Sequence, residues 1–597
     1  MHRAIHIPRV SRPSLAAHVR KGFSLPVLLL CALLAPRPAA TIPIGDTLTV
    51  IQRPLLNIPA IALPGGELPI SCTADPTTTG WTARLERGTF LVPLAIESAS
   101  YDPATLWWTL AARVPEAGVI RLYELYDLVV AADGGIADRT RNAVRLIPQY
   151  RSTYYFVHIT DTHLPTELYY YEPGALTDSS EVLDLRAVFA DLDVINPEFV
   201  VLTGDLVNEG ELEDFLERRY FTRAQRQLAE AQVPVFLTAG NHDIGGWNST
   251  PPPSGTARRD WWRFFGWGRL DSPPPGAPWY TQDYSFDYGT VHFTCLESYD
   301  NYDNFRPEIY GETSFISSQL QWLAADLAQA SGATARVLLH HYDFAGQLNL
   351  AQLGVDLALW GHIHSDRGNI FQQPGDLATN NVGNGERAYR LVRVTNGEVY
   401  PQYTLTAGSS GERLRVVWSP ANDGTQETVS AEITNQQSQR FQNGLLKFRM
   451  PPGPGSYQVT GGSLAQIADS ADVALCHVNV DILPSVTQTV TLVKLPADVG
   501  DDAIASSTRL WLAGENPFMR ATEFGFSLAR SGWARLTIHA PDGRAVARLV
   551  DRVVPAGSHA LPWDGRSESG EPVPAGVYFA RLECESGAIT RKVIVAR

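Results

Sequence analysis

Five apolar runs between residues 156 and 364 each end in Asp, Asn or His residues, which are residue types that can bind metal ions. Helical patterns lie between several of the runs: LDLRAVFADLDVI (183–195), FTRAQRQLAEAQ (221–232) and SQLQWLAADLAQA (318–330). Strand, helix and strand in alternation predict α/β architecture. The runs with their endings are FVHITDTH (156–163), FVVLTGD (199–205), VFLTAGNHD (235–243), RVLLHH (336–341) and LALWGHIH (357–364).

These endings are expected to converge in space. In open α/β sheets a site lies beyond the carboxyl ends of the strands, where the residues after each run would meet. Gly204, Gly240 and Gly361 stand directly before candidate ligands, and a residue without Cβ allows the backbone to crowd such a centre. The histidines of GHIH, His362 and His364, are two residues apart and leave the same face of an extended backbone.

The residue types favour a pair of metal ions. Carboxylate and amide oxygens with imidazole nitrogens, and no thiolate, suit divalent or trivalent Mn, Fe or Zn. A carboxylate can bridge two ions, and Asp205 is the natural bridge. Paired ions neutralise a phosphoester, lower the pKa of a bound water and align its attack. His242 lies between Asn241 and Asp243 in the sequence and is the candidate for protonating the oxygen of the leaving group.

The motifs DTH, GDLVN, GNHD, HH and GHIH, in this order, resemble the calcineurin-like metallophosphoesterase superfamily over about residues 152–405. The resemblance implies a four-layer, two-sheet α/β sandwich with a dinuclear site. It implies that one metal is held by Asp161, His163, Asp205 and His364. It implies that the other metal is held by Asp205, Asn241, His340 and His362.

Three further residues are expected near this site as substrate contacts or supports behind the ligands: Asn208, Asp243 and His341. For Asn208 the alternative is a helix or turn residue near the site rather than a substrate contact. Asn208 occupies the position at which the purple acid phosphatases carry a tyrosine that binds a metal ion. The purple charge-transfer centre of those enzymes is therefore not expected here. The motifs are closer to the branch of bacterial cyclic-nucleotide and glycerophosphodiester phosphodiesterases.

A long segment, residues 247–282, is dense in Pro, Gly, Trp and Arg and shows no lasting periodicity. A loop of this length in a compact domain is usually functional. We expect it to cover the site, with Arg258, Arg259 and Arg263 meeting phosphate and the tryptophans stacking on a leaving group. The alternative is packing against a neighbouring domain.

The rest of the chain divides around this region. Short alternating runs with turn signals predict β-sandwich, immunoglobulin-like domains on both sides of the α/β domain. The last of them resembles the FlgD-type immunoglobulin-like domains of exported bacterial proteins, through NPF (516–518), WDGR (563–566) and AGVYFARL (575–582). That resemblance implies contact with secretion or cell-surface machinery; the alternative is a plain structural cap. The expected boundaries are a signal peptide at 1–40, a β-sandwich at 41–148, the metallophosphoesterase domain at 149–405, a β-rich domain at 406–504 and the FlgD-like domain at 505–597.

The N-terminus predicts export. A basic segment without acids precedes FSLPVLLLCALLA (23–35), an apolar run of signal-peptide length, and the alternative is an uncleaved anchor. We expect a periplasmic, cell-surface or secreted protein with no stable membrane span. Cys72, Cys295, Cys476 and Cys584 are far apart and are expected to be isolated thiols. The net charge of −15 argues against binding to a nucleic-acid polymer through a basic surface.

Together these features predict an exported phosphoesterase that hydrolyses phosphomonoesters or phosphodiesters. Two alternatives remain open. One is a surface binding protein built on an inactive phosphoesterase fold. The other is a nuclease or nucleotidase on the same scaffold.

Overall fold

A computed structural model describes residues 45–596, apart from short gaps, and divides the chain into two compact units. Unit 1 comprises residues up to 453 together with 457–494, and unit 2 comprises 454–456 and 495–597. The predicted signal peptide lies outside the described residues. The gaps are 117–119, 165–179, 215–217, 245–255, 267–281, 299–313, 409–412, 470–471, 497–508, 515, 529–531, 555–556, 569 and 585–586.

The first part of unit 1 is an eight-stranded sheet in the order β1-β3-β6-β5-β4-β7-β8-β2. Its strands alternate between buried and exposed residues; in β3, Leu68, Ile70 and Cys72 are buried. This period of two is the reason that the sequence reads as strands here. The strands are β1 (Ile51–Arg53), β2 (Ala60–Ala62), β3 (Glu67–Cys72), β4 (Thr82–Arg87), β5 (Phe90–Asp102), β6 (Trp107–Arg113), β7 (Leu125–Ala132) and β8 (Ile136–Leu146).

The α/β region contains two five-stranded sheets, in the orders β11-β10-β9-β17-β18 and β12-β13-β14-β15-β16. Strands β9, β10 and β11 are parallel, and so are β13 to β16. The strands are β9 (Thr153–Ile159), β10 (Val200–Thr203), β11 (Val235–Thr238), β12 (Tyr284–Tyr288), β13 (Val291–Leu296), β14 (Ala335–His340), β15 (Leu357–Trp360), β16 (Gly375–Ala378), β17 (Ala388–Thr395) and β18 (Glu398–Thr406).

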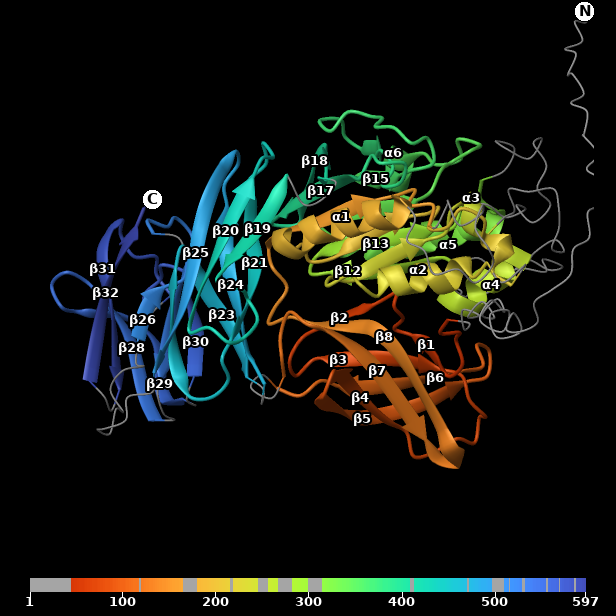
Figure 1. Ribbon diagram of the computed structural model, residues 1–597. Coiled ribbons are helices and arrows are strands. Elements are labelled where there is room, and N and C mark those ends of the chain that lie inside the picture. The colour runs from red at the N-terminus through yellow and green to blue at the C-terminus, as the bar shows by residue number, and fades with distance from the viewer. Residues whose placement is uncertain are drawn as a thin grey trace, which may run out of the picture. The chain divides into compact units, whose positions relative to one another are not determined.

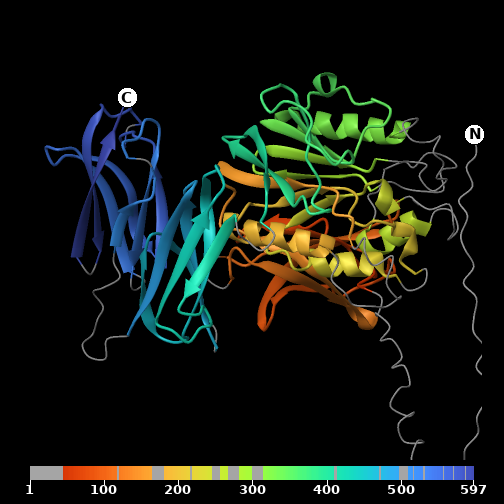
Figure 2. The ribbon, with the colours of Figure 1, turned by 45° about the horizontal axis from the view of Figure 1, so that its top comes forward.

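The predicted helices are present and cover the outer faces of these sheets (Figures 1 and 2). Helices α1 and α2 share a core with one face of the first sheet, and α5 shares a core with one face of the second. Aromatic and aliphatic side chains of both sheets meet in a third core between them. The region is therefore four layers deep and mixed α/β. The helices are α1 (Ser180–Ile195), α2 (Tyr220–Leu228), α3 (Asn241–Ile244), α4 (Thr256–Phe265), α5 (Ser317–Gln329) and α6 (Leu350–Leu353).

Strand β14 shows how the layers divide the side chains of one strand. Val337 and Leu339 lie in the core between the two sheets, whereas Leu338 lies in the core beneath α5. Successive side chains of a strand point to opposite faces. The same alternation decides which of the two following histidines reaches the site between the sheets.

The remaining part of unit 1 is made of strands in the orders β19-β20-β25-β22 and β21-β24-β23. Helix α1 packs against β21, and both contribute to one continuous core. The strands are β19 (Leu414–Ser419), β20 (Thr428–Asn435), β21 (Phe441–Met450), β22 (Gly455–Thr460), β23 (Ser463–Asp469), β24 (Ala474–Ile482) and β25 (Val486–Pro496).

Unit 2 has its own core, between sheets in the orders β26-β27-β30 and β29-β28-β31-β32. The predicted last domain, 505–597, falls within this unit. Its strands are β26 (Arg509–Leu512), β27 (Thr522–Leu528), β28 (Gly532–His539), β29 (Ala545–Val554), β30 (Gly557–Trp563), β31 (Gly576–Cys584) and β32 (Gly587–Val595).

Two predictions about the whole chain can be compared with the described residues. The four cysteines that follow the predicted signal peptide are thiols and form no disulfide within the described residues, and Cys72, Cys295 and Cys476 are buried, so the expectation of thiols rather than a disulfide framework is confirmed. Within the described ranges, no helix combines the length and the apolar character needed to cross a bilayer.

Candidate metal centre

The site lies at the carboxyl ends of strands from both central sheets. β9 ends before Asp161 and His163, and β10 ends before Asp205. On the second sheet, β14 leads to His341, and β15 leads to His362 and His364. Parallel strands bring their carboxyl ends to one edge, which is why residues far apart in sequence converge here. The main chain closes this edge: the N–H of Gly361 donates to the His341 carbonyl at 2.9 Å.

The backbone at this edge is strained. Asp161, His163, Asp205, His362 and His364 all have a positive φ, between 46° and 68°. A left-handed conformation costs a residue with a Cβ roughly 1–2 kcal/mol. Strain of this kind persists where the surrounding structure holds it, and it clusters at functional sites. Five strained residues at one sheet edge therefore point to a site that orients side chains at the expense of stability.

Two of the predicted glycines are needed because the ligand residues lie against them. A Cβ on Gly361 would collide with the Thr160 hydroxyl and with Oδ2 of Asp161. A Cβ on Gly240 would collide with the backbone and Oδ1 of Asp205. The third, Gly204, has a φ of +86°, and a Cβ there would lie 2.6 Å from Nδ1 of His341. The expectation that missing Cβ atoms allow crowding at this centre is confirmed.

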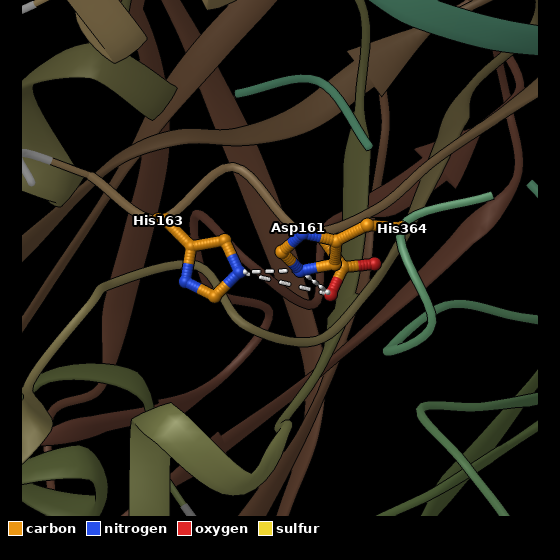
Figure 3. A group of neighbouring side chains, drawn as sticks. All are labelled: Asp161, His163 and His364. Atoms are coloured by element: carbon orange, nitrogen blue, oxygen red, sulfur yellow. Dashed lines mark hydrogen bonds and ion pairs between the residues drawn. The ribbon is translucent and has the colours of Figure 1, made fainter. Parts of the chain in front are cut away.

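Asp161, His163 and His364 form the first group of side chains that could hold a metal (Figure 3). The Nε2 atoms of the two histidines are 3.0 Å apart. Oδ1 of Asp161 is 3.3 Å from Nε2 of His364 and 3.8 Å from Nε2 of His163. Ligands bound at right angles around an ion at about 2.1 Å would themselves be about 3 Å apart. The three side chains therefore have the spacing of ligands to one ion.

Asp205, His341 and His362 form a second group. Oδ2 of Asp205 lies 3.2 Å from Nε2 of His341, and Oδ1 of Asn241 lies 3.0 Å from Nδ1 of His362. Asp205 also reaches toward the first group, with its Oδ2 atom 3.8 Å from Nε2 of His163. Its carboxylate therefore lies between the two sets of histidines, where a bridging ligand would stand.

The two adjacent histidines lie on different sides of strand β14. His340 was expected as a ligand and His341 as its support, but His341 joins Asp205 and His362, and His340 does not. The cause is the alternation along β14. His340 faces the side of Leu338, with its ring 6.2 Å from that of Phe315, whereas His341 faces the side of Leu339, between the sheets.

His341 is prepared for a ligand role by its other nitrogen. Its Nδ1–H donates to the carbonyl of Thr203 at 2.7 Å, which leaves Nε2 facing Asp205. Ligand histidines commonly donate their second N–H to a carbonyl, which fixes the tautomer and the ring orientation. The His341 side chain is fully buried.

His242, the expected proton donor, also borders Asp205. Its backbone N–H donates to Oδ1 of Asp205 at 2.9 Å, and its Nδ1–H donates to the carbonyl of Asn208 at 2.6 Å. Its Nε2 lies 4.0 Å from Oδ2 of Asp205, and its ring meets that of His163 edge-on at 4.8 Å. Asn208 thus orients His242 through its backbone carbonyl.

Asp243 joins the loops that carry Asp205 and Asn241. Its carboxylate accepts hydrogen bonds from the backbone N–H groups of Gly240 at 2.8 Å, Val207 at 3.0 Å and Leu206 at 3.2 Å. Burial and the neighbouring Asp205 raise the pKa of Asp243 to about 8. These hydrogen bonds place Asp243 behind the loops that carry the candidate ligands.

The histidines of the site differ in the direction in which their surroundings shift their pKa values. Burial and the positive charge of a nearby histidine lower the pKa values of His163 and His362 to about 4, so both are neutral at pH 7. Burial also disfavours the charged form of His341, but the Asp205 carboxylate outweighs it and raises the pKa to about 9. His341 in turn holds the pKa of the buried Asp205 well below its usual range. A metal binding here would replace the His341 proton.

Two further supports behind the ligands, Thr160 and His158, were not identified from the sequence. Thr160 donates from its hydroxyl to Oδ2 of Asp161 at 2.7 Å. The fully buried His158 lies between the hydroxyls of Thr203, at 2.7 Å, and Thr379, at 2.8 Å. The polar residues His158, Thr160 and Thr203 inside apolar runs are the only signal that the sequence carried for them.

Within the long segment 247–282, residues 256–266 and residue 282 are described. Helix α4 is packed into the core: Trp261 is fully buried and donates from its indole N–H to Gln282 at 2.9 Å. Arg263 pairs with Asp214 at 2.9 Å and with Asp260 at 3.1 Å. The described helix therefore has a packing role, and the prediction that Arg263 meets phosphate is not supported by these contacts. The predictions for Arg258 and Arg259 concern side chains outside the described set.

The donor set fits metal ions. Asp161 and Asp205 are almost fully buried and close to each other, and imidazole nitrogens face one another at 3.0 Å. Buried like charges and opposed nitrogens are unfavourable unless a cation or a proton lies between them. Oxygen and imidazole donors without thiolate suit Mn, Fe or Zn.

The chain is similar to one protein family model and to several solved structures. A family model described as calcineurin-like phosphoesterase matches residues 154–366. A purple acid phosphatase from yellow lupin (Lupinus luteus) seeds has 14% identity, with 58% of this chain and 73% of that chain covered and a TM-score of 0.34. A dimetal phosphatase from Danio rerio has 16% identity, with 43% and 99% covered and a TM-score of 0.29. No curated protein matches the chain.

The family match spans the five strand ends on which the site is built, from DTH to GHIHSD. It ends at Asp366, just beyond the GHIH pair. Residues 154–366 of this chain therefore form a calcineurin-like phosphoesterase domain.

Proposed function

We propose that this protein is a phosphoesterase that uses two metal ions to hydrolyse phosphomonoesters or phosphodiesters. The observation that carries the proposal is the position of Asp205 between two sets of histidines, 3.8 Å from His163 and 3.2 Å from His341. Asp161, His163, Asp205 and His364 would hold one ion. Asp205, Asn241, His341 and His362 would hold the other.

When bound, paired ions supply positive charge to the phosphoester oxygens and acidify water for attack on phosphorus. Side chains of this protein would bind the ions and hold the ligand loops in place. Neutral His163 and His362 offer lone pairs at pH 7, because burial keeps their pKa values near 4. Asp243 and Thr160 hold the two carboxylate-bearing loops through hydrogen bonds at 2.7–3.2 Å.

His242 is the residue that we assign to proton transfer. Because its Nδ1–H is committed to the Asn208 carbonyl, proton transfer falls to Nε2. Nε2 faces the carboxylate of Asp205, where a reacting ester would be held. A protonated Nε2 can donate to the departing oxygen and thereby stabilise the leaving alkoxide.

The test is hydrolysis of p-nitrophenyl phosphate and bis(p-nitrophenyl) phosphate by the purified chain with Mn²⁺, Fe²⁺ or Zn²⁺. We expect turnover in the wild type and a large loss in Asp205→Asn and His362→Gln. Asp287→Asn, on strand β12 and 70% exposed in its side chain, is a matched control that should keep activity. No turnover with any metal would favour the alternative of an inactive binding protein.

A nuclease is less favoured because the chain carries a net charge of −15. Incubation with plasmid and with single-stranded DNA under the same metal conditions tests it, and we expect no cleavage.

We also propose that residues 1–40 direct export to the periplasm, the cell surface or the medium. We propose that the flanking regions are immunoglobulin-like β-sandwiches. We propose that residues 505–597 act in sorting or attachment. The apolar run 23–35 and the FlgD-like motifs support these proposals. Fractionation of a bacterial host that produces the full chain, the chain without residues 1–40, or the chain ending at 504 tests both parts. If all three proteins were found in the same cellular fraction, both the export role of residues 1–40 and the sorting role of residues 505–597 would be contradicted.

A further inference from the structure

A cluster of aromatic rings lies beside His362. The ring of Tyr342 stacks on the imidazole, with centroids 4.9 Å apart and planes inclined by 28°. The ring of Phe344 meets the same imidazole edge-on, at 4.7 Å and 73°. The two rings also touch each other, at 4.7 Å. The segment that follows His341 thus covers one side of a predicted metal ligand with aromatic surface.

The rings of Tyr342 and Phe344 are partly exposed, and hydrogen bonds hold the segment that carries them. Strand β14 ends at His340, so Tyr342 and Phe344 lie beyond the carboxyl edge of the sheet, and both are only half-buried. The backbone N–H of Tyr342 donates to the Ser298 hydroxyl at 3.2 Å, and the Asp343 carboxylate accepts from Leu348 N–H at 2.7 Å. Held in this way, the rings can receive a ligand without first becoming ordered.

We propose that Tyr342 and Phe344 form a subsite for a planar ring on the phosphoester, so that the preferred substrates are aryl or nucleobase-bearing esters. The inference rests on the proposed function. A phosphoryl group bound at His362 would bring its ester substituent next to the two rings, because they contact that imidazole directly. A flat substituent can stack on or meet these rings edge-on, whereas a short alkyl group offers little area.

A positioning role makes a different prediction. If the two rings only orient His362, removing one weakens the binding of every phosphoryl ligand by the same factor. If they form the subsite, the loss falls on ligands that carry a ring. The discriminating quantity is therefore the ratio of affinities for two ligands that differ only in the substituent.

The experiment measures binding of phenylphosphonate and methylphosphonate to the Mn²⁺-loaded full chain by isothermal titration calorimetry. We expect phenylphosphonate to bind about tenfold tighter to the wild type, as one aromatic pair contributes roughly that factor. In Tyr342→Leu and in Phe344→Leu, which keep apolar volume but lose a ring, the ratio should fall to about two. Tyr403→Leu, on β18 and 69% exposed, is the matched control and should keep the wild-type ratio.

Equal affinities for the two phosphonates in the wild type would overturn the subsite while leaving the phosphoesterase proposal intact. An equal loss for both ligands in the two leucine variants, with the ratio unchanged, would also overturn it and assign the rings to positioning. Absence of both phosphonate binding and ester hydrolysis in the wild type would instead remove the proposed function and the subsite with it. Should Tyr342→Leu fail to fold, Phe344→Leu gives the same comparison.

Discussion

Nε2 of His341 lies 3.2 Å from Oδ2 of Asp205, while the ring of the adjacent His340 lies against Phe315 beneath α5. One step along the chain therefore separates a side chain at the site from one in an outer core. The neighbouring residues His340 and His341 should therefore respond very differently to substitution.

The first prediction compares these two residues. His341→Gln should lower the bound metal from two ions to one per chain and reduce kcat/KM roughly 100-fold or more, because it removes a ligand nitrogen and the partner of Asp205. His340→Gln should keep both ions. Metal content by mass spectrometry after dialysis, together with turnover of an aryl phosphate, checks both. Loss of an ion from His340→Gln with retention in His341→Gln would return the ligand role to His340.

The choice between His340 and His341 shows where the sequence stops being informative. The strand ends, the residue types and the convergence of Asp161, Asp205 and His362 follow from the pattern of apolar runs, and the structure brings these residues together. Strand β14 is buried on both faces, as parallel strands usually are, so its sequence shows no alternation from which the facing could be read.

Other features of the site depend on contacts that sequence spacing does not reveal. The left-handed backbone at Asp161, His163, Asp205, His362 and His364 arises from the meeting of loops from two sheets. His158 gains its role only because Thr203 and Thr379, distant in sequence, lie on either side of its ring. The α/β architecture could be predicted from periodicity, but these long-range polar contacts could not.

The second prediction concerns His242. His242→Gln should keep both metals and lower kcat roughly 10²- to 10⁴-fold for esters with alkyl leaving groups. The loss should be much smaller for p-nitrophenyl esters, because p-nitrophenolate needs little help from a proton donor. Rates for the two kinds of ester in wild type and variant give the comparison. Equal losses for both kinds, together with loss of an ion, would make His242 a ligand instead.

The third prediction uses the crowded glycines. Gly361→Ala should weaken metal affinity roughly 10- to 100-fold, because its Cβ would displace the Asp161 carboxylate and the Thr160 hydroxyl that orients it. Gly332→Ala is the matched control, since a Cβ there would meet nothing within 4 Å. Titration with Mn²⁺ measures both variants. A Gly361→Ala protein with wild-type affinity would show that the carboxylate is free to move.

The fourth prediction concerns stability and lies outside the metal site. His292 is bonded to Asp287 at 2.7 Å and to Asp326 at 3.0 Å. Burial disfavours its charged form, but the two carboxylates outweigh this and raise its pKa from 6.5 to about 9. A group whose pKa is higher in the folded state stabilises the fold fully below its unfolded pKa, and the contribution disappears as pH rises through the folded value.

His292→Gln should therefore lower the free energy of unfolding by about 1 kcal/mol at pH 6 and by much less at pH 10. Urea denaturation of wild type and variant at pH 6, 8 and 10 measures the difference. A difference that stays constant across these pH values would mean that packing, rather than charge, accounts for the effect of the substitution.

The central claim is that Asp205 is shared by two metal ions, and the metal content of Asp205→Asn tests it most directly. The wild type, saturated with Mn²⁺ and freed of excess metal, should hold two ions per chain, and so should the control Asp287→Asn. Asp205→Asn should lose both, since the carboxylate faces both sets of histidines. An Asp205→Asn protein that still binds two ions, or a wild type that binds none, would contradict the account.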